Sequence, residues 1–287
     1  MIRRDFHVHT VLCDGKALAE EMVAAALKKN MDVLGFSGHA YTSLDETWCM
    51  SPEKTEIYRA ELGRLKEKYK GQIRLLVGVE QDFYSDGDLS WAEYRIGSSH
   101  YVMKNGKLLE LDDRAAEQRS IADMYFGGDL MRLAEYYYDQ EAELLEKTGA
   151  DVIGHFNLIE KFNENCCMYD TASPRYRRAW QRAVDRLLES GVPFEINTGA
   201  ISRGYRTEPY PDREMIKYIS ESGGAFILSS DSHNTDTLLF GFEELEEYAC
   251  ENGLKLLDMP RLRTVSAGTA ESEIIQITGA EFGRRHY

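Results

Sequence analysis

In the stretch Asp5-Phe6-His7-Val8-His9-Thr10, the apolar residues Phe6 and Val8 alternate with two histidines that are separated by one residue. Successive side chains of a β-strand point to opposite faces, so a strand here would direct His7 and His9 to the same side. Neutral imidazole is the commonest metal ligand among side chains. The pattern therefore predicts part of a metal site at the end of a strand, with further ligands supplied by other segments.

Further runs with this strand-like character alternate with longer helical patterns along the whole chain. The predicted strands are Asp5–His9, Asp32–Ser37, Ile73–Glu80, Tyr94–Tyr101, Asp151–His155, Pro193–Asn197 and Ala225–Ser230. The predicted helices are Ala17–Lys29, Pro52–Lys70, Ala122–Lys147 with a break near Gly127-Gly128, Pro174–Ser190, Asp212–Ser222 and Phe242–Glu251. This alternation predicts an α/β protein with a parallel sheet, closed or nearly closed into a barrel at this length. A doubly wound open sheet is the alternative, although no Gly-x-Gly-x-x-Gly or Walker A loop supports a nucleotide-binding version.

Metal-binding residue types gather at or just beyond the ends of the predicted strands. In a parallel barrel the carboxyl ends of all strands face the same side, where active sites form. The candidate ligands are His7, His9, Asp14, His39, Glu80, His100, His155, Asp231 and His233. Any one of them alone could be structural, but so many polar groups buried together are costly unless they are paired or bind metal. Their number and chemistry suit two or three divalent ions of Zn, Mn or Fe better than one.

These motifs resemble those of the polymerase and histidinol phosphatase (PHP) superfamily, and the resemblance extends from Asp5 to His233. It implies a distorted seven-stranded, TIM-barrel-like (β/α)7 barrel, with residues 1–287 forming a single PHP-type domain that ends in a short tail. It also implies three metal positions. The first is formed by His7, His9, Glu80 and Asp231, the second by Glu80 as a bridge with His100 and His155, and the third by Asp14, His39 and His233.

The resemblance also implies an activity. Stand-alone members of this length include the histidinol-phosphate phosphatases of histidine biosynthesis, and residues 154–159 and 195–198 are similar to theirs. Hydrolysis of histidinol phosphate to histidinol and phosphate is therefore expected. In the corresponding mechanism, a metal-bound hydroxide held by His7, His9, Glu80 and Asp231 attacks phosphorus in line. A broader phosphoesterase acting on nucleotides or other phosphorylated metabolites and a non-catalytic metal-holding scaffold are the alternatives.

Four further residues are candidates for contact with the substrate or its surroundings. Arg203 follows the sixth predicted strand and Lys161 follows His155, and both could bind the substrate's phosphate. Arginine is the stronger candidate because its guanidinium group can bind phosphate in a bidentate manner. Glu195 and Asn197 would point the same way from the sixth strand. They could contact the amine or imidazole of the substrate, or support the metal ligands from behind.

The composition limits the partners and the location. A formal net charge of −15, from 34 basic and 49 acidic residues, disfavours binding to long nucleic acids or anionic membranes. It does not exclude a small phosphorylated substrate, because metal ions reverse the local field. The sequence shows neither a signal peptide nor an apolar stretch of membrane-spanning length, so a cytoplasmic location is expected. No oligomeric state is predicted.

Overall fold

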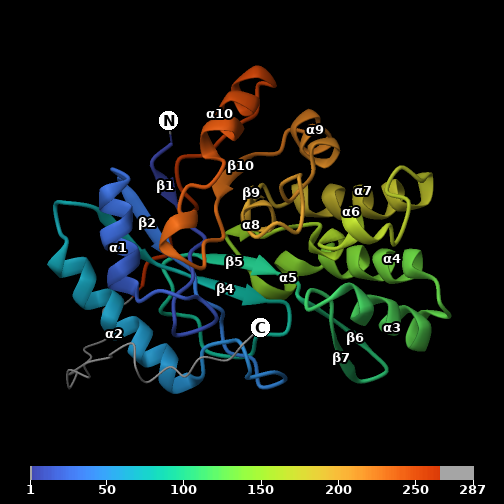
Figure 1. The fold of residues 1–287 in the computed structure, drawn as a ribbon, viewed down its shortest axis with the longest axis horizontal. Helices are drawn as coiled ribbons and strands as arrows, with labels where there is room; N and C mark the ends of the chain where they lie inside the picture. The colour runs from blue at the N-terminus through green and yellow to red at the C-terminus, as the bar shows by residue number, and fades with distance from the viewer. Residues whose placement is uncertain (1, 266–287) are drawn as a thin grey trace.

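The computed structural model describes residues 2–265, and Figure 1 shows its strands at the centre of the molecule. The three-stranded sheet has the order β1-β2-β3, formed by Arg4–Asp5, Val33–Phe36 and Arg74–Val77. The five-stranded sheet has the order β10-β9-β8-β5-β4, formed by Phe226–Ser229, Phe194–Asn197, Val152–Ile153, Arg95–Ser98 and Val79–Asp82. Every pair in these two sheets is parallel. The predicted α/β class with parallel strands is therefore confirmed.

The two parallel sheets are connected by a segment that takes part in both. Strands β3 and β4 are separated only by Gly78, and β3 pairs with β2 whereas β4 pairs with β5. Isolated parallel bridges also join Val8 to Ser232 and His39 to Glu80. The described residues form ten strands in three hydrogen-bonded groups, which differs from the seven-stranded count expected from the sequence.

Tyr94 explains why glycine stands at position 78, where the predicted third strand divides. A Cβ atom on Gly78 would lie 2.3 Å from the Tyr94 ring, so no larger residue fits without a shift. The buried Tyr94 hydroxyl lies 2.6 Å from the carbonyl oxygen of Phe6 and 3.0 Å from that of Phe36, and donates to them. Because a buried hydroxyl needs partners, this contact fixes the ends of β1 and β2 directly before the predicted ligands.

The second difference from prediction lies after β5. The segment predicted as one strand through Tyr101 stops at Ser98, and β6 (Tyr101–Lys104) and β7 (Lys107–Glu110) form an antiparallel hairpin. Asn105 and Gly106 form its turn with positive φ angles of 52° and 73°. Asn-Gly with this backbone conformation is the preferred two-residue hairpin turn.

Helices are present at all six predicted positions, but the third prediction is divided and begins earlier, at Ala115, and the short helices α6 and α8 were not predicted. Their bounds are Ala19–Lys28 (α1), Pro52–Lys68 (α2), Ala115–Phe126 (α3), Leu130–Glu141 (α4), Leu144–Thr148 (α5), Asn163–Cys166 (α6), Pro174–Leu188 (α7), Gly199–Ser202 (α8), Arg213–Glu221 (α9) and Phe242–Glu251 (α10). Two 3-10 turns, Leu158–Glu160 (η1) and Thr235–Thr237 (η2), complete them. The long helix predicted over 122–147 is three helices. The predicted break at Gly127-Gly128 is present, because both glycines have positive φ.

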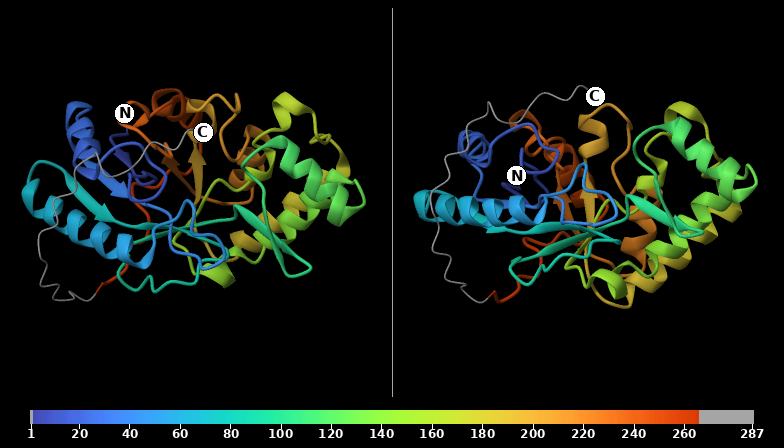
Figure 2. Two further views of the ribbon diagram at one scale, coloured as in Figure 1. Left: turned by 60° about the horizontal axis from the view of Figure 1, so that its bottom comes forward. Right: turned by 90° about the horizontal axis from the view of Figure 1, so that it is seen from below.

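The helices lie around the sheets, as the two further views in Figure 2 show, with α1 and α2 at one end and α3, α4 and α7 at the other. The largest apolar cluster joins α4 and α7 to β9 and β10, and a second joins α1 and α2 to β2. No helix among residues 2–265 is both long and apolar enough to cross a membrane. The predicted C-terminal tail lies largely outside the described residues.

Candidate metal centre

The structure brings the nine predicted ligands together at the carboxyl ends of the strands. Their ring nitrogens and carboxylate oxygens form four overlapping groups in which all ligand atoms lie within 4.8 Å of one another. These groups are His9, Asp14, His39 and His233; His7, Glu80 and His155; His7, His9 and Asp231; and His39, Glu80 and His100. Residues separated by more than two hundred positions thus meet in one place, because the parallel strands all deliver their ends to the same side.

Glu80 in β4 lies at the centre of the cluster and is 1% exposed. Its carboxylate oxygens contact five imidazole nitrogens: His7 Nε2 at 3.1 Å, His9 Nε2 at 3.3 Å, His39 Nδ1 at 3.1 Å, His100 Nε2 at 3.4 Å and His155 Nε2 at 2.8 Å. The Oε1 atom faces His100 and His155, whereas Oε2 faces the other rings. This division suits a carboxylate that bridges two metal positions, as the resemblance implies.

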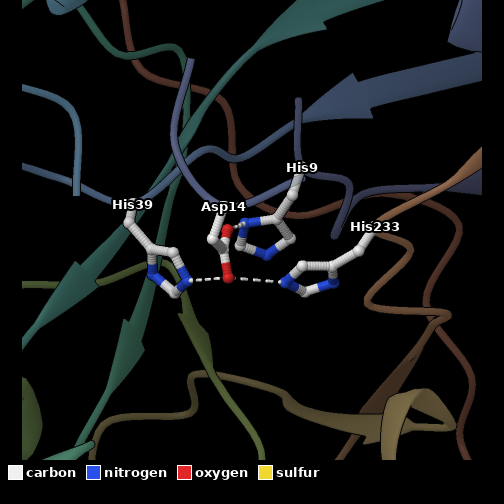
Figure 3. A group of neighbouring side chains, drawn as sticks. All are labelled: His9, Asp14, His39 and His233. Atoms are coloured by element: carbon white, nitrogen blue, oxygen red, sulfur yellow. Dashed lines mark hydrogen bonds and ion pairs between the residues drawn. The ribbon is translucent and has the colours of Figure 1, made fainter. Parts of the chain in front are cut away.

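A second group of ligands surrounds Asp14, which follows β1 (Figure 3). Asp14 Oδ2 lies 2.9 Å from His233 Nε2 and 3.5 Å from His39 Nε2, and its Oδ1 lies 3.3 Å from His9 Nδ1. The His9 and His233 rings are stacked with their centres 4.1 Å apart. His9 and His39 each face Asp14 with one nitrogen and Glu80 with the other. His9 and His39 therefore contact both the ligands around Asp14 and the ligands around Glu80.

Several ring nitrogens in the cluster have no hydrogen-bond partner. His7 Nε2, His9 Nε2 and His39 Nδ1 are all buried, and their contacts with carboxylates are not aligned as hydrogen bonds. Leaving a polar atom in this state costs about 1–3 kcal/mol. A neutral imidazole nitrogen can instead donate its lone pair to a metal ion. The nitrogen and oxygen donor set, together with these three buried atoms, fits Zn, Mn or Fe.

The electrostatics of the cluster keep its carboxylates ionised. Although burial opposes it, the imidazoles of His39, His7 and His100 hold the pKa of Glu80 well below its usual range. Burial also lowers the pKa of His7, but the charges of Glu195 and Glu80 outweigh it and raise that pKa well above its usual value. The Glu80 carboxylate is thus ready to act as a ligand, whereas a proton competes for the His7 imidazole. Metal binding is consequently coupled to proton release.

Glu195 and Asn197 support the cluster from behind and do not line the cavity. Glu195 Oε2 lies 2.8 Å from His7 Nδ1, and its Oε1 accepts hydrogen bonds from the His155 backbone N–H at 2.5 Å and Asn197 Nδ2 at 2.8 Å. Asn197 Oδ1 accepts from the Gly199 N–H at 2.8 Å. Of the two roles considered from the sequence, these contacts fit support of the ligands.

Sequence reasoning missed a comparable support, Asp82. Its Oδ2 accepts from the His100 backbone N–H at 2.9 Å and lies 3.2 Å from His100 Nδ1, so it orients the ring. Asp82 stands two residues after Glu80, on the same face of β4. That spacing is a signal that could have identified it.

The two predicted phosphate-binding cations both line the cavity. Arg203 donates from Nη2 to Asp231 Oδ2 and from Nη1 to the Asp231 carbonyl oxygen, each at 2.9 Å. Gly199 makes this arrangement possible, because a Cβ there would lie 2.5 Å from Asp231 Oδ2 and 2.7 Å from Arg203 Nη2. Lys161 donates to the carbonyl oxygen of Asp112 at 2.5 Å, and its side chain is 14% exposed, against 32% for Arg203.

The cavity beside the cluster has a volume of about 340 Å³. Its wall also contains residues that sequence reasoning did not identify: Thr47, Trp48, Tyr101, Glu110, Asp112, Leu158, Ala200, Tyr205 and Tyr210. Several of them come from the β6–β7 hairpin and from the loop after β2. The Asn105-Gly106 pair was the one sequence signal that could have placed the hairpin.

Comparisons with known proteins agree with this geometry. The PHP domain model matches residues 5–199. A protein of Deinococcus radiodurans named "probable histidinol-phosphatase" is 28% identical over 84% of this chain and 90% of its own length. The histidinol-phosphatase of Bacillus subtilis is 21% identical over 86% of this chain and 99% of its own. A crystal structure of histidinol phosphate phosphatase from Lactococcus lactis, complexed with zinc, L-histidinol and phosphate, has a TM-score of 0.66 and 15% identity, covering 89% of this chain and 95% of that one.

Proposed function

The chain belongs to the PHP domain family, and from this premise we propose that it hydrolyses histidinol phosphate to histidinol and phosphate in histidine biosynthesis. The observation that carries the proposal is the convergence of nine imidazole and carboxylate ligands beside a cavity that also contains Arg203. Relatives named histidinol-phosphatase that match most of the chain support this substrate. A metal-dependent phosphomonoesterase is the corresponding reaction class.

Two or three divalent ions of Zn, Mn or Fe would be held by the four overlapping ligand groups described above. Bound metal would supply positive charge for the phosphate and lower the pKa of water. The protein's own part is to fix the ligands. Glu195 sets the proton of His7 on Nδ1 and so leaves Nε2 free to ligate, and Asp82 orients His100 in the same manner.

Arg203 is the residue proposed to bind the phosphate group. Its guanidinium is held by Asp231 at the cavity wall, 32% of the side chain remains exposed, and other N–H groups can donate to phosphate oxygens. Burial lowers its pKa, but Asp231 outweighs that effect and raises it, so the group stays charged. Lys161 is a weaker candidate for the same role, because its side chain is only 14% exposed and an ammonium group cannot bind phosphate in the bidentate manner of a guanidinium.

The proposal is tested by measuring phosphate release from histidinol phosphate beside a panel of nucleotides and phosphosugars, using metal-reconstituted protein. We expect selective turnover of histidinol phosphate that is lost in Asp231→Asn. The matched control Asp236→Asn changes an exposed acid a few residues away and should retain turnover. Cleavage of other phosphoesters without cleavage of histidinol phosphate would exclude the proposed substrate.

Three finer features belong to the same proposal. The two parallel sheets would form one distorted seven-stranded barrel in a single domain, with β3 and β4 counted as one strand. The bridges from Val8 to Ser232 and from His39 to Glu80 support this arrangement. The partner is a small phosphorylated metabolite rather than long nucleic acid, and the site of action is the cytoplasm.

A further inference from the structure

The cavity continues past the metal ligands along an aromatic wall. The Trp48 ring lies edge-on to His39 with ring centres 4.4 Å apart, and 5.5 Å from the His100 ring. It also stacks against Tyr101, with ring centres 5.8 Å apart and an angle of 27° between the rings. The Trp48 indole N–H donates to the Tyr101 hydroxyl, which in turn donates to Asp45 Oδ2 at 2.8 Å. These bonds hold the two rings as one surface that starts at the metal ligands and leads away from them.

Glu110 lies beside Tyr101 on this surface. It is the cross-strand neighbour of Tyr101 in the β6–β7 hairpin, and it lines the same cavity. Among residues 2–265, no lysine, arginine or histidine nitrogen lies within 4 Å of its carboxylate, in contrast to Asp112, which pairs with Lys161. Its charged neighbours are instead the acids Asp112, Asp113 and Asp45, with His100 beyond them. Burial and the three acids raise the pKa of Glu110 to about 7, although His100 acts in the opposite direction. Among the described residues the carboxylate therefore has no ion-pair partner.

The two ends of the cavity thus differ in chemistry. Arg203 and the metal ligands at one end suit a phosphate group. Flat aromatic rings and a partly buried acceptor at the other end suit a planar ring that carries N–H groups, because such a ring can pack on the indole and donate to the carboxylate.

We propose that Trp48, Tyr101 and Glu110 form the subsite for the heteroaromatic ring of the substrate, with Glu110 accepting a hydrogen bond from a ring N–H. This inference rests on the proposed function of the same site. It means that the β6–β7 hairpin and the loop after β2 determine which ring the substrate may carry. A site built around such a hydrogen bond rejects an analogue that lacks the donor, because the buried acceptor is then left unpaired.

The test measures binding directly, so that it does not depend on turnover. Dissociation constants for histidinol and for phenylalaninol are determined by calorimetry with the metal-loaded full chain in the presence of phosphate. The two ligands share the amine and the alcohol, and only histidinol has a ring N–H. The variants are Glu110→Gln and the matched control Asp113→Asn, which removes a nearby exposed acid paired with Arg114.

We expect the wild type to bind histidinol about 10- to 100-fold more tightly than phenylalaninol, the size expected for a hydrogen bond to a charged group. Glu110→Gln should lower this ratio at least about tenfold, whereas Asp113→Asn should keep it within about twofold. A wild-type ratio near one, an unchanged ratio in Glu110→Gln, or an equal fall in Asp113→Asn would each overturn the subsite. Failure of the wild type to release phosphate from histidinol phosphate is a separate result, and it contradicts the proposed function. The ratio of the two dissociation constants still shows whether Glu110 binds the ring N–H.

Discussion

Replacing Glu195 by glutamine should weaken metal binding through the tautomer of His7. In the structure, Glu195 Oε1 accepts from two donors, the His155 backbone N–H and Asn197 Nδ2, and Oε2 faces His7 Nδ1. In Glu195→Gln the amide oxygen must keep the position with two donors, so the amide NH2 faces His7. His7 Nδ1 then becomes an acceptor, and the ring proton moves to Nε2, the atom that would ligate metal.

The magnitude follows from this exchange of protons. If His7 in the variant is to bind metal through Nε2, its ring proton must return to Nδ1. The Nδ1–H group and the glutamine NH2 group, both donors, then face each other in a fully buried place. A buried polar group without a partner costs about 1–3 kcal/mol, which corresponds to roughly 5- to 150-fold weaker metal binding. Removal of similar supporting partners in metal sites weakens affinity or activity by about 10- to 100-fold.

Zinc affinity measured by competition with a chromophoric chelator provides the assay. The matched control is Glu164→Gln, which changes an exposed carboxylate that accepts hydrogen bonds from Arg206 and Thr207 but does not line the cavity. We expect the control to bind zinc like the wild type. If Glu195→Gln is folded by circular dichroism and binds zinc within about twofold of the wild type, the tautomer argument is wrong.

Three other changes have defined outcomes. Gly199→Ala should displace Arg203 from Asp231, because the added Cβ would lie 2.7 Å from Arg203 Nη2 and 2.5 Å from Asp231 Oδ2; we expect a crystal structure to show the displaced guanidinium, and an unmoved one would contradict this. Arg203→Ala should raise KM for histidinol phosphate about tenfold or more through loss of a charged hydrogen bond, and an unchanged KM would exclude the phosphate role. Burial and neighbouring acids raise the pKa of Glu110 to about 7, so this carboxylate loses its charge as the pH falls from 8 to 6. Histidinol binding by the wild type should therefore weaken over that pH range more than binding by Glu110→Gln. Parallel pH profiles of the two dissociation constants would refute the role of the Glu110 charge.

The convergence of the nine candidate ligands could be predicted from the sequence because their residue types mark the ends of strands. His7 and His9 alternate on one strand end, and parallel strands bring distant ends such as Asp231 to the same side. Each of these placements depends on a local pattern and a general rule of topology. No detailed packing had to be known for them.

The opposite wall of the cavity could not be predicted in the same way. Trp48 lies in the loop after β2, and its position depends on contacts with Tyr101 and His100 that are distant in sequence. Glu110 is reached only through the hairpin, which the Asn105-Gly106 turn could have indicated. The lack of room for a side chain at Gly78 comes from the buried Tyr94 ring, and no local property of the sequence shows that contact.

The central claim is that the clustered ligands hold metal ions that are required to release phosphate from histidinol phosphate. The most direct measurement is a titration of chelator-treated protein with Zn or Mn while phosphate release from histidinol phosphate is followed. We predict no turnover in the chelated protein and a return of activity that levels off near two or three equivalents of metal. Undiminished turnover after complete metal removal, or full metal occupancy without turnover of histidinol phosphate, would contradict the claim.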